Sequence, residues 1–225
     1  MRKYAASEDL PKSVSRKDVD DIRWVDNIVP FQLSNKYSHM QKALIVEALL
    51  DLQRQSCFKF VKRTMEDDYI SIEPLDGCYS YVGRIGGRQV MSLARDCLVP
   101  YIIWHEMMHA LGFEHEHQRP DRDAYIRVQY SNVVPGQIVN FEKLRMNEVD
   151  LYGHVYDYYS IMHYDGTAFG RFDRKSKKRL VTMIPIKRGV RLKDNTELTM
   201  LDVEKLNLLG ECTKQSGVLI ILRAH

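Results

Sequence analysis

The sequence has no apolar run of the roughly 20 residues that a membrane-spanning helix needs. Its N-terminal stretch also lacks the apolar centre of a signal peptide. The formal net charge is only +3 over 225 residues, which gives no reason to expect a nucleic-acid partner. No Asn-X-Ser/Thr sequon occurs, so glycosylation offers no clue to the compartment. With 44% hydrophobic and 28% charged residues, we expect a globular protein of one domain or two tightly joined lobes.

Cysteine is scarce, and no two cysteines form a C-x-x-C pair. That absence argues against a cysteine zinc site and against a thioredoxin-like redox motif. An even number of cysteines favours two disulfides in an extracellular protein, with three possible connectivities. Four buried free thiols are the alternative. The residues are Cys57, Cys78, Cys97 and Cys212.

The most informative pattern is H-E-x-x-H-x-x-G-x-x-H, which runs from His105 to His115. His105 and His109 are four residues apart, so a helix places them on one face, one turn apart. Gly112 tolerates the positive φ that ends a helix, and the returning chain can bring His115 to the same point. Three imidazoles with one position open for water are typical of catalytic zinc, whereas structural sites are closed by four ligands. Glu106 can hold that water.

A bare H-E-x-x-H can arise by chance on an amphipathic helix. The added glycine and third histidine at fixed offsets argue strongly against chance, and the extended pattern is the signature of the metzincin proteases. We therefore predict one zinc ion per chain, bound by His105, His109 and His115.

Hydrophobic periodicity predicts helices and strands on both sides of this motif. A helix is expected over 41–55, and the motif helix over 99–111. A further helix should start at Thr199, in a capping box with Asp202, and end at Gly210. The expected strands are 28–33, whose Pro30 indicates an edge strand or a strand start, 57–61, 69–72 and 89–93.

The chain from His105 to Asp123 closely resembles the signature of the astacin family of zinc endopeptidases. Three further stretches resemble the family's mature start, its edge-strand motif and its Met-turn. The cysteine spacing matches as well, and the resemblance covers about 22–212. The three stretches are 24–31, 83–93 and 156–164.

The resemblance implies an α+β, metzincin-type fold in two lobes. One lobe would hold a twisted five-stranded mixed sheet and the long active-site helix. The other would be irregular and followed by a C-terminal helix. It implies the disulfides Cys57–Cys212 and Cys78–Cys97, of which the first ties the C-terminal end back to the N-terminal half. The expected divisions are an N-terminal extension or pro-segment remnant (1–21), the catalytic domain (22–212) and a C-terminal tail (213–225).

The resemblance also implies roles for individual residues. Glu106 would be the general base. Tyr164 would be a fifth zinc ligand at rest and a donor to the transition-state oxyanion during turnover, although a half-buried packing residue is the alternative. Met162 would form an apolar floor beneath the metal. Protein or peptide substrates would lie extended along the edge strand, which we place at 89–93. His117, His154 and His163 are expected to be structural or at the surface.

The family is made as zymogens, commonly with an F-x-G-D motif whose aspartate blocks the zinc. No such motif precedes Trp24, so the chain resembles a mature enzyme with a short extension. The family buries the mature amino terminus near the glutamate that corresponds to Glu116. By that comparison the terminus falls near 15–17, and a chain that still carried 1–14 could not bury it.

A basic run over 171–179 is either a solvated loop or a surface that attracts acidic substrates or an anionic matrix. The apolar stretch 217–222 is too short to span a membrane and is either a strand or the start of further chain.

Three functions are consistent with these residues. The favoured one is a secreted zinc endopeptidase. An inactive, metal-binding relative that recognises peptides conflicts with the intact Glu106 and Tyr164. A structural zinc protein that binds partners through its basic loop conflicts with a site of only three histidines.

Overall fold

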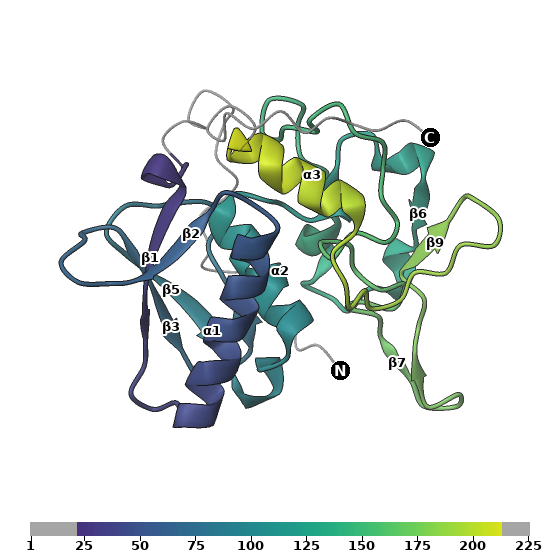
Figure 1. Ribbon diagram of the computed structural model, residues 1–225. Coiled ribbons are helices and arrows are strands. Elements are labelled where there is room, and N and C mark those ends of the chain that lie inside the picture. Colours follow the sequence, from purple (N-terminus) through teal and green to yellow (C-terminus); the bar gives the residue numbers. More distant parts are fainter. Residues whose placement is uncertain (1–21, 213–225) are drawn as a thin grey trace, which may run out of the picture.

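The computed structural model describes residues 22–212; the segments 1–21 and 213–225 lie outside that range. The expectations for the mature N-terminus and for 217–222 therefore stay predictions. The described chain has the predicted α+β architecture. Figure 1 shows the sheet and α1 on one side, α2 in the middle and the short strands β6, β7 and β9 on the other side.

The upper lobe, residues 28–111, is built on a mixed five-stranded sheet with the order β2-β1-β3-β5-β4. Three neighbouring pairs are parallel, and only β4 runs antiparallel to its neighbour. The middle strand β3 is buried at three consecutive positions, because side chains cover both of its faces. The strands are β1 (Ile28–Leu33), β2 (Lys59–Lys62), β3 (Tyr69–Glu73), β4 (Cys78–Tyr79) and β5 (Arg88–Leu93).

The strand predicted over 89–93 is not an edge strand. It forms β5, which lies between β3 and β4, because the chain segment before it returns antiparallel and covers its outer side. The edge on this side of the sheet is therefore the two-residue β4, which the sequence analysis did not predict. Its shortness explains the omission, since two residues give no measurable alternation.

The strand that contains Pro30 is also internal, between β2 and β3. The carbonyl of Phe31 faces β2, where it accepts a hydrogen bond from Arg63 N–H. Pro30 therefore faces the β3 side, and the ladder with β3 begins only at Phe31. Pro30 has no N–H to donate, but it lies before this ladder begins, so no hydrogen bond between β1 and β3 is lost. The prediction of a strand start at Pro30 is therefore confirmed for the pairing with β3, and the prediction of an edge strand is wrong.

Helices α1 (His39–Arg54) and α2 (Pro100–Leu111) pack against each other. Helix α1 begins two residues before the predicted start, because the Ser38 side chain and Gln41 form a capping box. Trp104 Nε1 donates to Ala48 O at 3.0 Å, and this bond joins the two helices. Helix α2 is buried along most of its length because both lobes cover it. The buried face of α1 consists of Ile45, Ala48, Leu49 and Leu52.

The lower lobe, residues 116–195, is mostly irregular, as predicted, but it contains two small antiparallel sheets. Strand β6 (Ile126–Val128) pairs with β9 (Met183–Pro185), and β7 (Phe172–Asp173) pairs with β8 (Lys178–Arg179). The basic run over 171–179 is thus a hairpin rather than an unstructured loop. The short 3₁₀ turns of the described chain are Val25–Asn27, Arg95–Cys97, Glu116–Gln118, Arg122–Ala124, Tyr130–Asn132 and Ile138–Phe141.

Helix α3 (Met200–Leu209) closes the fold and rejoins the upper lobe. Its N-cap is Thr199 in the predicted capping box, and Gly210 ends it. The structure contains both disulfides that the resemblance implies. Cys57–Cys212 ties the end of α3 to the start of β2, and Cys78–Cys97 joins β4 to the chain before α2. Within residues 22–212, no helix has the length and apolarity needed to cross a membrane.

Candidate metal centre

Three imidazoles meet at the end of α2. His105 and His109 lie one turn apart on the helix, and Gly112 ends it with a φ of 122°. The chain then turns back and brings His115 to the same point, as the spacing predicts. The ligand atoms of the three side chains lie within 4.8 Å of one another, so the group could hold a metal ion.

Each of the three rings directs one nitrogen to an acceptor outside the cluster. Nδ1 lies 2.8 Å from Ile161 O in His105, and 2.7 Å from Phe113 O in His109. In His115 it lies 3.1 Å from Gln118 Oε1. A carbonyl oxygen can only accept, so Nδ1 carries the hydrogen and Nε2 keeps its lone pair for a metal.

The donor set fits zinc. Nε2 of His109 and Nε2 of His115 are 3.1 Å apart. Two nitrogens about 2.0–2.1 Å from one tetrahedral ion would be about 3.3–3.4 Å apart, which is close to that separation. Burial and the neighbouring imidazoles hold the pKa of His115 well below its usual value, so the ring is neutral and able to bind a cation.

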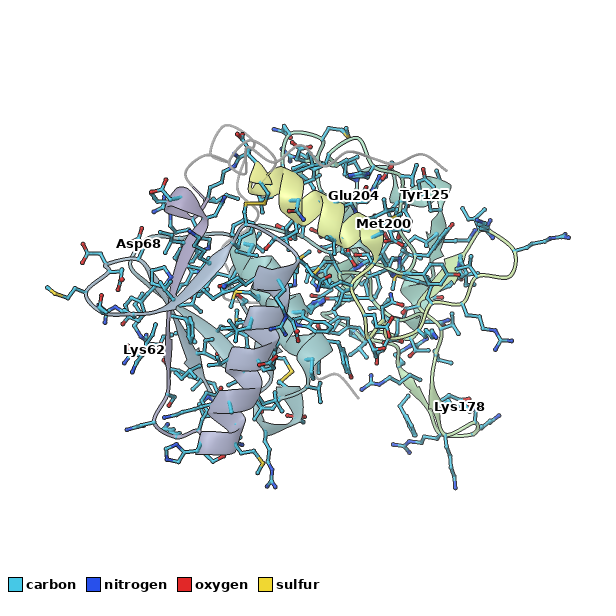
Figure 2. All side chains as sticks on the ribbon, in the orientation of Figure 1. Lys62, Asp68, Tyr125, Lys178, Met200 and Glu204 are labelled. Carbon is cyan, nitrogen blue, oxygen red and sulfur yellow. A yellow bond between two sulfur atoms is a disulfide. The ribbon has the colours of Figure 1, made fainter. Side chains whose placement is uncertain are left out.

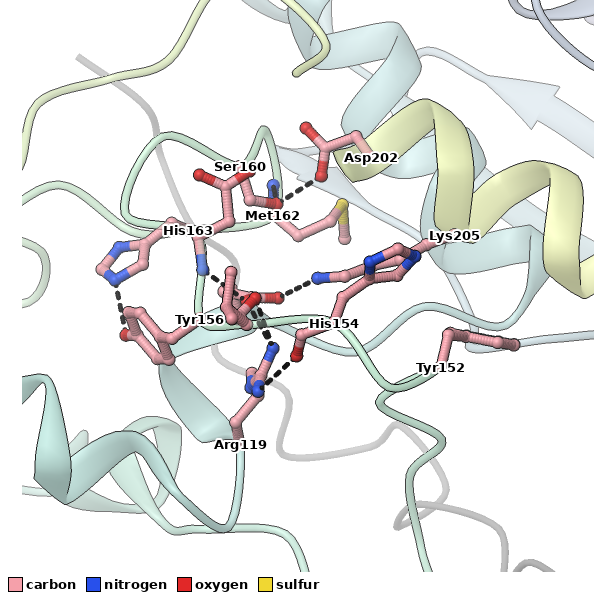
Figure 3. A network of polar contacts seen from close by, with 12 residues as sticks. Arg119, Tyr152, His154, Tyr156, Ser160, Met162, His163, Asp202 and Lys205 are labelled. Carbon is pink, nitrogen blue, oxygen red and sulfur yellow. Dashed lines mark hydrogen bonds and ion pairs between the residues drawn. The ribbon is translucent and has the colours of Figure 1, made fainter. Parts of the chain in front are cut away.

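The Met-turn, residues 156–164, supports the first histidine from below. Ile161 accepts the bond from His105 and donates its own N–H to Asp202 Oδ2 at 2.9 Å. Asp202 Oδ1 accepts from the Ser160 hydroxyl at 2.6 Å (Figure 3). Asp202 therefore links the N-terminus of α3 to the carbonyl that orients His105. Met162 of the Met-turn is also buried, with 2% of its surface exposed.

Glu116 lies in a buried network that fills the space beside the third histidine. Its Oε2 accepts from Lys205 Nζ at 2.8 Å, and its Oε1 accepts from Arg119 Nη1 at 2.9 Å. The N–H of Asp157 also donates to Oε1 at 2.9 Å. Figure 3 shows Lys205 extending from α3 and Arg119 lying below it, on a separate segment of the chain. Within the described residues, both carboxylate oxygens of Glu116 are thus paired with hydrogen-bond donors.

Tyr164 lies between two histidine rings and is 4% exposed. Its ring centroid is 4.3 Å from that of His115, and it stacks on His117 at 4.1 Å and 28°. His117 is fully buried and held by Asn140 O at 2.9 Å, so its placement agrees with a structural role. His163 is also buried, with its ring bonded to the Tyr156 hydroxyl.

Glu106 is 6% exposed on α2, beside the first histidine. The segment after the edge strand β4 runs next to the same helix, because Gly83 N–H donates to His109 O at 2.8 Å. The chain that follows the edge strand therefore contacts the helix that carries His105 and His109. Asp202, Lys205 and Gln118 were not predicted from the sequence as parts of the centre. Of these three residues, only Asp202 had a recognisable signal in the sequence, namely its position in the capping box with Thr199.

The family model described as Astacin, a peptidase family, matches residues 17–210. The chain belongs to the astacin family. It is 57% identical over 218 residues to zinc metalloproteinase nas-12 of Caenorhabditis elegans, with 96% of this chain and 56% of the relative covered. It is 40% identical over 192 residues to nas-13 of the same organism, with 85% of this chain and 41% of the relative covered.

A solved relative agrees in fold. High choriolytic enzyme 1, a hatching-enzyme zinc protease of the medaka fish Oryzias latipes, is 32% identical with a TM-score of 0.76. The match covers 94% of this chain and 98% of that chain. The present chain thus carries an astacin zinc metalloendopeptidase domain, and it spans about half the length of the curated relatives it matches.

Proposed function

We propose that this protein is a secreted, zinc-dependent endopeptidase that hydrolyses internal peptide bonds of proteins. The observation that carries the proposal is the geometry of the three imidazoles, whose Nδ1 atoms are all bound to acceptors while their ligand atoms converge. His105, His109 and His115 would hold the ion. Zinc bound there would polarise the scissile carbonyl and lower the pKa of water.

Glu106 is the proposed general base. It follows a metal ligand on a buried helix, so its carboxylate lies in surroundings that strengthen electrostatic interactions. It would accept a proton from the attacking water and pass it to the nitrogen of the leaving amine. One group thus serves as base and then as acid, and no second carboxylate is needed.

Tyr164 is the proposed oxyanion donor. Its ring lies beside the third histidine, and this proximity supports the proposed role. The hydroxyl would donate a hydrogen bond to the oxygen on which negative charge develops. Its stacking on His117 supports a defined orientation of the ring beside the centre.

Substrate would bind extended along β4, the edge strand nearest the metal ligands. An edge strand offers main-chain N–H and C=O groups that a peptide can pair with, independent of its side chains. The contact between Gly83 and His109 keeps this edge next to the centre. The two disulfides and the relatedness to a hatching enzyme support secretion.

Digestion of casein tests the proposal. The wild-type protein should cleave it, a chelator should stop cleavage, and added zinc should restore it. Glu106→Gln should keep its zinc and fold but lose activity by about 10³-fold or more, because the proton carrier is gone. Glu47→Gln, an exposed glutamate on α1, is the matched control and should be fully active. Cleavage by Glu106→Gln at the wild-type rate would rule out the mechanism.

A further inference from the structure

Positive charge is concentrated in one part of the chain. Between Arg171 and Lys193 there are ten lysines and arginines and a single carboxylate, Asp173, which gives this stretch a net charge of +9. The whole chain carries +3, so the remaining residues together carry −6. A charge asymmetry of this size indicates a surface for an anionic partner.

The cations lie on two arms of the lower lobe, which we call the basic surface. The first arm is the β7–β8 hairpin (171–179) and the second is the segment after β9 (187–193). All ten cationic side chains are exposed. Within residues 22–212, none of them lies within 4.0 Å of a carboxylate, in contrast to Arg84 and Arg88 of the upper lobe, which are paired.

The first arm is anchored rather than loose. Arg171 N–H donates to Asn132 O at 2.8 Å, and Leu180 N–H donates to Arg171 O at 2.9 Å. Asp173 accepts from the Ser176 hydroxyl at 2.6 Å and from Lys175 N–H at 3.0 Å, so the one carboxylate is used to shape the turn. These bonds hold the backbone that carries the cations of the hairpin.

The second arm rises from the same base. Thr182, which follows the hairpin, is fully buried and its hydroxyl donates to Ala168 O at 2.8 Å. Ile186 N–H donates to Tyr125 O at 2.7 Å, which fixes the start of the arm. Figure 2 shows Lys178 at the far end of the projecting hairpin, away from Met200 and Glu204 of α3. Both arms lie on the β6–β9 side of the molecule (Figure 1).

We propose that the basic surface binds a linear sulfated polysaccharide and holds the enzyme on it. A sulfate group accepts paired hydrogen bonds from a guanidinium, and the surface offers five arginines among its ten cations. A linear polyanion carries closely spaced charges over a long distance, so one chain can contact both arms. Binding of this kind is independent of the metal centre and so goes beyond the proposed proteolysis.

The side chains at the hairpin tip disfavour an anionic membrane as the partner of that arm. Membrane-surface segments insert apolar side chains into the headgroup layer. The hairpin tip, residues 174–177, has only cationic and hydroxyl side chains. Its exposed aromatic residue, Phe172 at 60% exposure, pairs with Arg179 at the base of the hairpin instead. The tip is thus suited to a polyanion in water.

Three variants with four charges removed from each test the proposal. The hairpin variant is Arg174→Ser, Lys175→Ser, Lys177→Ser and Lys178→Ser. The second-arm variant is Lys187→Ser, Arg188→Ser, Arg191→Ser and Lys193→Ser. The matched control removes four exposed cations of the upper lobe, and consists of Lys36→Ser, Lys59→Ser, Lys62→Ser and Arg95→Ser.

Binding to heparin is measured at about 150 mM NaCl by surface plasmon resonance, with Glu106→Gln as the background so that no proteolysis occurs. We expect each arm variant to raise the Kd by about tenfold or more, and the upper-lobe control by less than about twofold. Dextran sulfate should compete, whereas neutral dextran should not. Cleavage of a short neutral peptide by the same variants in the active background should be unchanged.

Several results would overturn the proposal. Equal losses in all three variants would show a non-specific response to net charge. Tighter binding to vesicles of phosphatidylcholine and phosphatidylserine than to heparin would assign the surface to membranes. Competition by a poly-glutamate peptide at lower concentration than dextran sulfate would assign it to acidic proteins. None of these readouts depends on the peptidase being active, so the two proposals fail separately.

Discussion

The two lobes are stabilised in different ways. One continuous cluster of apolar side chains, most of them from the upper lobe, packs the sheet, α1 and α2 together and extends to the Met-turn and α3. In the lower lobe, the apolar cluster is small, and it includes Tyr164 of the site itself. Charged side chains are buried there instead, with Arg119 at 3% and Arg122 at 2% exposure.

This difference means that one kind of interaction stabilises the fold and another kind positions the groups of the site. Hydrophobic burial is non-directional and holds the sheet and helices together without fixing any one atom to a fraction of an ångström. Hydrogen bonds are directional, and in the lower lobe they fix the carbonyl that orients His105 and the carboxylate beside His115. We therefore expect changes in the apolar core of the upper lobe to alter unfolding, and changes in the hydrogen-bonded groups of the lower lobe to alter the site.

The largest effect on stability is expected from the upper core. Leu49 on α1 is 1% exposed, and Leu49→Ala should lower the free energy of unfolding by about 3–5 kcal/mol, because a cavity replaces the buried side chain. Below the unfolding temperature, kcat and zinc content should be nearly unchanged. Urea unfolding measures the free energy of unfolding, and steady-state kinetics on the same preparation measure kcat. A matching loss of kcat would show that the lobes are not separable.

A change at Tyr164, in the lower lobe, should have the opposite effect and lower kcat rather than stability. Tyr164→Phe keeps the ring, its stacking on His117 and its burial, and deletes only the hydroxyl. Loss of one oxyanion donor should lower kcat by about 10²–10³-fold, with KM and zinc content nearly unchanged. Kinetics on a fluorogenic peptide measure this. A kcat within about threefold of wild type would leave Tyr164 as a packing residue.

Asp202 tests whether α3 orients a metal ligand. Asp202→Ala leaves the N–H of Ile161 without its acceptor and should weaken zinc binding by about 10–100-fold, as loss of outer-sphere partners typically does. Asp202→Asn should recover most of the affinity, because its carbonyl oxygen can accept from Ile161 and its amide can donate to Ser160. Competition with a fluorescent chelator measures the affinity.

Thr199→Ala is the control for that comparison. It removes the side-chain cap of α3 and so lowers stability, but it leaves the bond between Asp202 and Ile161 in place. Zinc affinity should stay within about twofold of wild type. If Thr199→Ala weakened zinc binding as much as Asp202→Ala, the effect would come from the helix and not from the bond to the Met-turn.

The boundary between the lobes contains a pH-dependent destabilising group. Glu114 lines a cavity of about 60 Å³ together with Glu148. Burial, with repulsion from Glu148 as the second cause, raises the pKa of Glu114 from 4.5 to about 7. The folded state therefore binds the proton more tightly than the unfolded state does, and stability from this group is lost as the pH rises from about 4.5 to about 7.

Glu114→Gln cannot ionise and so avoids that loss. Relative to wild type, it should gain about 1–3 kcal/mol of unfolding free energy at about pH 8 and almost nothing at about pH 4.5. Glu148 lines the same cavity, and it also accepts a hydrogen bond from Arg145 N–H. The control variant is Glu47→Gln, which changes an exposed glutamate on α1. Urea unfolding at several pH values measures the gain. A gain that is the same at every pH would contradict the account.

Local patterns in the sequence predicted much of the fold. The motif helix, its end at Gly112 and the capping box at Thr199 are local signals, and they are confirmed. The earlier start of α1 was also readable, since Ser38 and Gln41 have capping-box spacing. The order of the strands could not be predicted in this way. The position of a strand at the edge of the sheet depends on the returning chain around Cys78 and not on the residues of the strand itself.

The site shows the same limit. The three histidines have fixed spacings along one turn and one tight return, so their meeting followed from the pattern. Lys205 reaches Glu116 from 89 residues away, and Asp202 reaches Ile161 from 41 residues away. Such pairs follow only from the path of the chain. In the described chain Lys205 and Arg119 bond to Glu116, and the amino terminus that the resemblance implies beside it lies outside the described residues and stays a prediction.

The most direct test of the central claim is the metal content of the purified protein, measured by mass spectrometry on wild type and on His105→Ala, His109→Ala and His115→Ala. The account predicts about one zinc per chain in wild type and a large loss in each variant, because two imidazoles no longer complete the site. His154→Ala, outside the cluster, should keep its zinc. Full zinc in any of the three cluster variants would contradict the assignment of that histidine.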